Sequence, residues 1–103
     1  MKLYSIENMQ GKTFEVLGLV EGSTVQSKHI GKDIGAGLKS VVGGELKGYT
    51  DMLKDAREVA TKRMIKEAEA LGATAVIGVR FSSSAIIQGA AEIIVYGTAV
   101  REN

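Results

Sequence analysis

Cysteine, proline and tryptophan are absent from this chain of 103 residues, and its only aromatic residues are three tyrosines and two phenylalanines. Because there is no cysteine, the chain forms no disulfide and offers no thiolate to a metal ion. With so few aromatic residues, the core must be built from Val, Ile, Leu, Ala and Met. A core of small aliphatic side chains is thin, and association with further copies would bury more apolar area. The composition therefore favours an oligomer.

No charge of one sign predominates, since 13 Lys and Arg residues face 12 Asp and Glu residues. A concentrated basic surface and aromatic residues for base stacking, which mark nucleic-acid-binding proteins, are both missing. The N-terminal stretch lacks the apolar region of a signal peptide, and the longest apolar run is too short to cross a bilayer. We expect a cytoplasmic protein that binds neither nucleic acid nor membrane, with one domain over residues 1–103.

Glycine is abundant, and many of the 13 glycines lie between Gly31 and Gly48. Apolar residues at helical spacing within this segment predict a short helix over residues 32–42 that depends on tertiary packing. A nucleotide-binding loop does not fit, because Tyr49-Thr50 stand where a P-loop has Lys-Ser/Thr, and Ser40 stands where a dinucleotide fingerprint has its third glycine. The glycines therefore indicate close backbone packing.

The clearest pattern in the chain is a helix over Asp51–Leu71. Thr50 is its predicted N-cap and Gly72 its predicted C-terminal stop. An apolar stripe recurs at spacings of three and four residues. The stripe consists of Leu53, Ala56, Ala60, Met64, Ala68 and Leu71.

Strands are predicted over Thr13–Val20, Thr74–Ser82 and Ala91–Val100, and Ser23–Ser27 either continues the first strand or starts a neighbour. Gln88-Gly89 is the expected turn of a hairpin. The order of these elements predicts an α+β fold, with a small antiparallel sheet and two helices on one of its faces.

Strand alternation assigns apolar side chains to both faces of this sheet. In the first strand it groups Val16 with Val20 and Leu17 with Leu19. In the second it places Ala75, Ile77, Val79 and Phe81 under the long helix. The apolar residues then left uncovered are Leu17, Leu19, Val76, Ile94 and Tyr96. Loops or further subunits would cover them, and the short chain favours subunits.

Four residues are candidates for a metal site, with a divalent ion as the cofactor. His29 and Asp33 are spaced for one helical turn, and Glu15 and Glu92 would pair if their strands were neighbours. One histidine and one carboxylate are too few for a structural zinc site, which needs four ligands. A symmetric oligomer could supply further copies, whereas an exposed histidine and solvated carboxylates are the structural alternative.

Two other groups of polar residues have a chemical and a structural interpretation. Ser82-Ser83-Ser84 offer hydroxyls, but no neighbouring base is evident to activate a serine nucleophile, so a polar hairpin arm is favoured. Arg57 and Arg63 on the long helix could bind an anion, although surface salt bridges are the commoner role. No catalytic residue can be assigned.

The order and spacing of several short motifs resemble the YbjQ-like family. The matching pieces are Asp33–Leu38, Val41–Gly44, Tyr49, Ala56–Ala60, Ala68–Val79 and Gly97–Val100. The resemblance implies a small bacterial cytosolic protein whose dodecin-like subunit assembles into a pentamer. The family is labelled a heavy-metal-binding domain, but a chain with no cysteine and one histidine supports that label poorly.

Three functional hypotheses follow. The first is a non-enzymatic homo-oligomer, pentameric by the resemblance, that binds a small ligand, ion or partner. The second is a heavy-metal-binding protein. The third is an enzyme with an active site between subunits, which would need a titratable group with a perturbed pKa that the sequence does not reveal.

Overall fold

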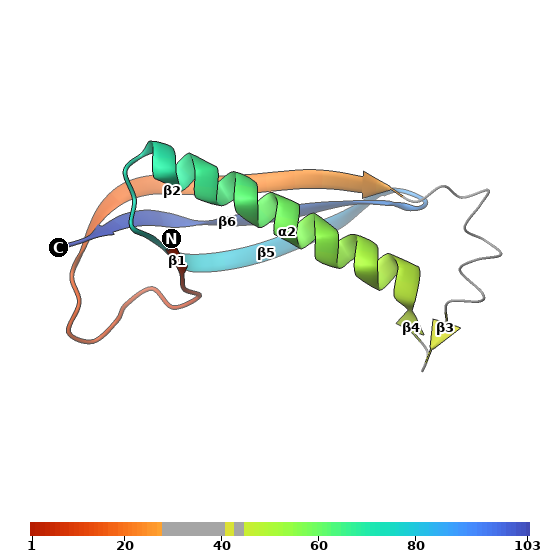
Figure 1. Ribbon diagram of the computed structural model, residues 1–103, viewed down its shortest axis with the longest axis horizontal. Helices are drawn as coiled ribbons and strands as arrows, with labels where there is room; N and C mark the ends of the chain where they lie inside the picture. Colours follow the sequence, from red (N-terminus) through yellow and green to blue (C-terminus); the bar gives the residue numbers. More distant parts are fainter. Residues whose placement is uncertain (28–40, 43–44) are drawn as a thin grey trace.

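A four-stranded sheet crossed by one long helix forms the body of the protein (Figure 1). The computed structural model describes residues 1–27, 41–42 and 45–103. The sheet has the order β1-β5-β6-β2, and a separate two-stranded sheet pairs β3 with β4. The elements are β1 Lys2–Leu3, β2 Phe14–Ser27, β3 Val41–Val42, β4 Glu45–Leu46, α2 Lys47–Ala70, β5 Ala75–Ile87 and β6 Ala90–Glu102. The predicted α+β fold is confirmed.

The sheet is mixed rather than wholly antiparallel. Strands β2, β6 and β5 pair antiparallel, as predicted, whereas β1 pairs parallel with β5. The hairpin prediction is confirmed, because β5 ends at Ile87 and β6 begins at Ala90, with Gln88 and Gly89 between them. Residues Ser23–Ser27 continue the first strand and do not start a new one.

The long helix is confirmed, although it begins earlier than predicted. It starts at Lys47, so Thr50 lies inside the helix and is not its N-cap. The predicted stop at Gly72 is confirmed. The Gly72 amide donates to the carbonyl of Glu69 (2.9 Å) and the next amide, that of Ala73, donates to the carbonyl of Ala68 (3.1 Å). This pair of bonds is the Schellman arrangement that ends many helices.

The expected glycine-rich helix over residues 32–42 lies largely outside the described residues. Its last two residues, Val41–Val42, are strand β3 and not helix. Within the described part of the chain, no helix is both long and apolar enough to cross a membrane.

The main core, called the helix-side core below, lies between α2 and the sheet. Its small residues let the helix and the sheet approach closely. The buried residues of this core are Val20, Ala56, Ala60, Met64, Ala68, Val76, Ile93, Val95 and Ala99. At Gly22 the helix backbone lies directly above the strand, because a Cβ there would collide with the Ala60 carbonyl and the Met64 amide. Only glycine leaves room for this contact.

A β-bulge in β2 changes which face its side chains occupy. The register with β6 shifts between Val16 and Gly18, which leaves Leu17 as one extra residue, and Gly18 has a positive φ of 144°. Leu17 therefore packs with the helix-side core that contains Val20, whereas Val16 and Leu19 are exposed. The predicted grouping was wrong because regular alternation does not continue through a bulge.

A second bulge, in β5, has the same consequence. The register shifts between Ile77 and Arg80, and Gly78 has a positive φ of 63°. Val76 is fully buried in the helix-side core, whereas Ala75 and Ile77 belong to a second cluster. The prediction that placed Ala75 and Ile77 under the helix was therefore wrong.

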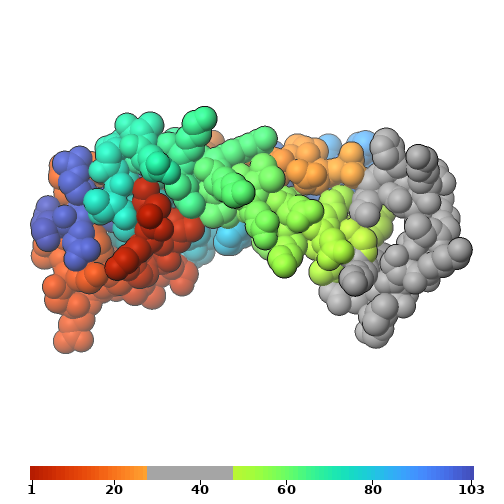
Figure 2. Space-filling view, viewed as in Figure 1, coloured from red at the N-terminus to blue at the C-terminus, as the bar shows by residue number. Residues whose placement is uncertain are grey.

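Among the described residues, the sheet face opposite α2, called the open face below, is covered at one end only. There Tyr4 and Phe14 pack against the cluster of Ala75, Ile77 and Val100. Both chain ends lie at this end of the molecule, and the β5–β6 turn lies at the other (Figure 1). The body is long and narrow (Figure 2), with extents of 54 × 26 × 17 Å.

Candidate functional site

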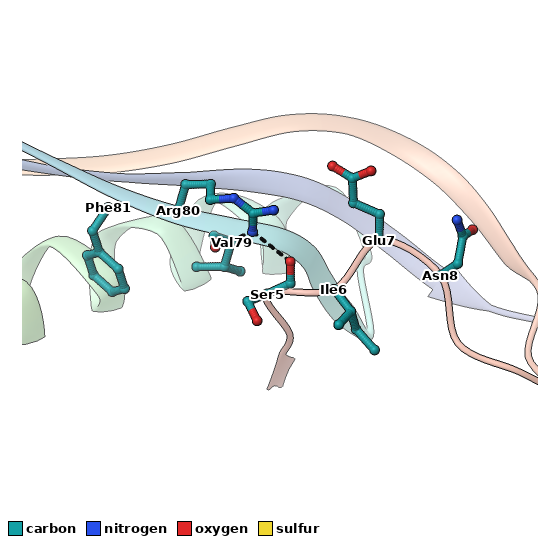
Figure 3. A pocket seen from close by; sticks show the side chains of 7 residues that line it. All are labelled: Ser5, Ile6, Glu7, Asn8, Val79, Arg80 and Phe81. Atoms are coloured by element: carbon teal, nitrogen blue, oxygen red, sulfur yellow. Dashed lines mark hydrogen bonds between the residues drawn. The ribbon is translucent and has the colours of Figure 1, made fainter.

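A pocket of about 730 Å³ lies where the N-terminal segment runs along the edge of β5 (Figure 3). It is open to solvent and has both polar and apolar walls. The lining residues are Ser5, Ile6, Glu7, Asn8, Val79, Arg80 and Phe81.

Backbone hydrogen bonds position the N-terminal segment beside β5. The Gly78 amide donates to the Ile6 carbonyl and the Val79 amide donates to the Tyr4 carbonyl, both at 2.9 Å. Both amides lie in the bulge, where Gly78 has a positive φ. Residues other than glycine rarely adopt this conformation. The pocket is therefore a consequence of the same bulge that divides β5 between two cores.

Arg80 is the main charged group of this pocket. Its Nη1 donates to the Ser5 carbonyl at 2.6 Å and to the Val79 carbonyl at 3.0 Å, as Figure 3 shows for the first bond. A guanidinium has further N–H donors in a fixed plane, which remain available to a ligand. Glu7 lies on the far side of the pocket and forms no ion pair with Arg80 or any other described residue. The pocket therefore presents a guanidinium and a carboxylate to solvent.

Glu15 and Glu92 lie on neighbouring strands but are not brought together. Glu15 is opposite Arg101 and its Oε2 lies 3.5 Å from Arg101 Nη1, while Glu92 is opposite Val25. Ten residues of β2 separate these two positions, a distance of about 33 Å along the strand. Within one subunit, they cannot share a cation.

His29 and Asp33 lie outside the described residues. Over residues 1–27, 41–42 and 45–103, no three His, Cys, Asp or Glu side chains gather as a metal site would require. The part of the chain that is described thus offers no metal centre built by one subunit.

The two helix arginines have different surroundings. Arg63 Nη1 donates to the Ser23 carbonyl at 2.7 Å and so ties α2 to β2. Arg57 lines a second depression, a groove of about 560 Å³ between α2 and β5. The serines 82–84 are exposed on β5, and no acidic or basic side chain of the described residues is bonded to them.

The open face carries an exposed apolar patch. Its members are Val16, Leu19, Val25 and Tyr96, which are 68%, 72%, 56% and 40% exposed; this set is called the open-face patch below. Leu19 and Tyr96 were predicted to be uncovered, and Ile94, also predicted, is half-buried beside them. Leu17 and Val76 were predicted as members but belong to the helix-side core.

Arg80, Glu7 and Phe81 are site residues that sequence reasoning did not select. Arg80 lies within the predicted strand Thr74–Ser82 with no further role indicated, and nothing near Glu7 or Phe81 in the sequence forms a known motif. The one available signal was Gly78 in the middle of a strand pattern, because an isolated strand glycine often marks a bulge.

Comparison with known proteins gives a consistent result. The family model described as "Putative heavy-metal-binding" (YbjQ) matches residues 1–103. A UPF0145 protein of Helicobacter hepaticus is 59% identical over 101 residues, which covers 98% of this chain and 97% of the relative. A UPF0145 protein of Clostridium novyi is 57% identical over 101 residues, with 98% of each chain covered.

Two further matches extend the range of relatives. A UPF0145 protein of Thermus thermophilus is 64% identical over 87 residues, which covers 84% of this chain and 76% of the relative. A crystal structure from Pediococcus pentosaceus, a protein with unknown function described as a DUF74 family member, superposes with a TM-score of 0.68 at 13% identity. The superposition covers 100% of this chain and 98% of that chain. Because the identity is only 13%, it supports the fold alone. From the full-length family match and these close relatives, the chain belongs to the YbjQ family of UPF0145 proteins.

Proposed function

We propose that this protein is a non-enzymatic, cytoplasmic homo-oligomer that binds a small ligand, ion or partner, and that its dodecin-like subunits form a pentamer. The observation that carries the proposal is the open-face patch. Its four large side chains lie on two adjacent strands, β2 and β6, and are 40% to 72% exposed. Large apolar side chains exposed along one face of a sheet favour an interaction surface.

The edge of the sheet supports the same proposal. Strand β2 is the last strand in the sheet order, so along its 14 residues one row of backbone groups has no neighbouring strand in the described sheet. A long edge strand with exposed apolar side chains readily pairs with another chain. A second copy of the same subunit offers both a matching edge and a matching apolar face.

The shape of the subunit is a further argument. Its radius of gyration is 17.0 Å, whereas a compact domain of this length has about 13 Å. An elongated subunit with a thin aliphatic core buries little apolar surface by itself. Packing against copies of itself would add the buried area that the subunit lacks.

The oligomer is tested by light scattering on the purified protein with one substitution in the open-face patch. Leu19→Lys places a charge at the patch, and we expect it to lower the measured mass to that of smaller species or the monomer. Leu71→Lys is the control, because Leu71 is 44% exposed but lies beyond the end of α2, away from the patch. A wild-type monomer at micromolar concentration would refute the proposal.

Heavy-metal binding is the second candidate function, and the family description favours it. The residues to test are His29, Asp33, Glu15 and Glu92. In a symmetric oligomer, copies of one residue could meet around an axis and supply the ligands that a single subunit lacks.

Calorimetric titration with zinc, nickel and copper tests this candidate. If metal is held by a ring of His29 side chains, His29→Ala should abolish binding while the oligomer stays intact. Glu69→Gln serves as the control, because Glu69 is an exposed carboxylate on α2 and is not one of the four candidate ligands. Metal binding that is unchanged in His29→Ala would remove histidine as a ligand.

A further inference from the structure

The groove between α2 and β5 is a second site with a distinct chemistry. It has a volume of about 560 Å³, within the range of small-molecule sites. Five of its lining residues come from one flank of α2 and one from β5. They are Lys54, Arg57, Glu58, Thr61, Lys62 and Phe81.

The geometry of helix and sheet explains why the groove exists. Helix α2 packs mainly over β2 and β6, whose Val20, Ile93 and Val95 form much of the helix-side core. Along the far part of β5 the helix leaves the sheet uncovered, and the diagonal crossing is visible in Figure 1. Residues three and four apart on a helix share one flank, so Lys54, Arg57 and Thr61 project along the same side.

The groove carries a net positive charge. Lys54, Arg57 and Lys62 are cationic and Glu58 is the single carboxylate. None of these three cations forms an ion pair or side-chain hydrogen bond with another described residue. Arg63, by contrast, is engaged with β2 through the Ser23 carbonyl. The cations that face β5 are therefore available to an anion, and a guanidinium can hold a phosphate or carboxylate through two parallel bonds.

Phe81 forms the opposite wall. It pairs across the strands with Val95, which places it on the helix side of the sheet, yet its side chain is 52% exposed. An exposed phenyl ring beside unpaired cations suits a ligand that has an aromatic body and an anionic group, because the ring stacks on the body and the cations bind the anion. The phenyl ring and the cations thus lie on opposite walls of one groove.

We propose that this groove binds a small aromatic phosphate or carboxylate. The proposal deepens the ligand-binding function and rests on it, but it needs no neighbouring subunit. Arg57 and Phe81 are the two residues expected to contribute most, with Lys54 and Lys62 adding positive charge. Thr61 is already oriented by its own hydrogen bond, which its Oγ1 donates to the Arg57 carbonyl at 2.7 Å.

The test is an amide-resolved NMR titration of the full chain with phenyl phosphate. Inorganic phosphate and benzyl alcohol are the comparison ligands, because each has only half of the required chemistry. We expect saturable shifts of the Thr61 and Phe81 amides, and phenyl phosphate should bind at least about fivefold more tightly than either comparison ligand. Equal affinity for inorganic phosphate would overturn the aromatic part of the proposal.

Substitutions identify the groups responsible. Arg57→Gln and Phe81→Leu should each weaken phenyl phosphate binding by about threefold or more. Lys66→Gln is the matched control, since Lys66 is an exposed cation on α2 outside the groove. Equal weakening by Lys66→Gln and Arg57→Gln would mean attraction to overall charge and would overturn the site.

Light scattering on the same samples separates this inference from the proposed oligomer. If the wild-type protein is an intact oligomer but does not bind phenyl phosphate, the groove proposal is refuted and the proposed oligomer is not. If Leu19→Lys yields a monomer that still binds phenyl phosphate with wild-type affinity, the site belongs to one subunit, as proposed. If the monomer does not bind although its fold is intact by circular dichroism, the single-subunit site is refuted.

Discussion

At Gly22 the backbone of a strand and the backbone of a helix meet without a side chain between them. A methyl group at this position would overlap the Ala60 carbonyl and the Met64 amide. Neither atom can move aside as a flexible side chain would, because both belong to the hydrogen-bonded helix. The position of α2 on the sheet therefore depends on this one glycine.

Gly22→Ala is expected to destabilise the fold strongly. Overpacking usually costs 1–3 kcal/mol, and a clash with backbone should bring the loss in unfolding free energy to about 3 kcal/mol or more. Urea unfolding followed by circular dichroism measures it. Ser23→Ala, one residue along on an exposed site, should change the free energy by less than about 0.5 kcal/mol. A loss at Gly22 no larger than that at Ser23 would contradict the close contact.

Single residues also explain why the sequence could not predict which face of the sheet some strand side chains occupy. Alternation correctly separates Ile93 from Ile94 in β6, since that strand is regular. In β2 and β5 it fails at Gly18 and Gly78, where one extra residue exchanges the two faces. A glycine in a strand pattern signals that a bulge is possible, but only pairing with β6 decides where the extra residue lies.

At the scale of elements, the long helix and the hairpin could be predicted because their signals are local. Spacing of apolar residues, a terminal glycine and a turn dipeptide all lie within a few residues of the structure they specify. Strand β1 could not be predicted, since two residues at the N-terminus form a strand only by pairing with Ala75 and Val76.

The two candidate sites could not be predicted either, and the reason is the same as for β1. The N-terminal pocket joins Ser5–Asn8 to Val79–Phe81, and the groove joins one flank of α2 to Phe81. These contacts link residues that are far apart in the sequence and follow from how the elements pack. The sequence did identify Arg57 as a possible anion ligand, and its place in the groove supports that interpretation.

At the scale of the whole molecule, two surfaces could take part in association. The open-face patch lies on one side of the sheet, and it borders the edge of β2 that has no neighbouring strand in the described sheet. The helix-side core is buried, but it consists largely of alanine and valine. Small side chains contribute less burial free energy than large ones, so the isolated subunit should be only marginally stable.

If subunits stabilise one another through the open-face patch, thermal stability must depend on protein concentration. A folded state that exists only in the oligomer gains free energy as concentration rises, so the melting temperature should increase by about 5 °C for each tenfold increase. Differential scanning calorimetry over a hundredfold concentration range measures this slope. Leu19→Lys should reduce the slope toward zero, because it weakens association, whereas Leu71→Lys should keep the wild-type slope even if its melting temperature is lower. A melting temperature independent of concentration in the wild type would instead assign all of the stability to the single subunit, and the apolar patch would then need a partner other than a second copy.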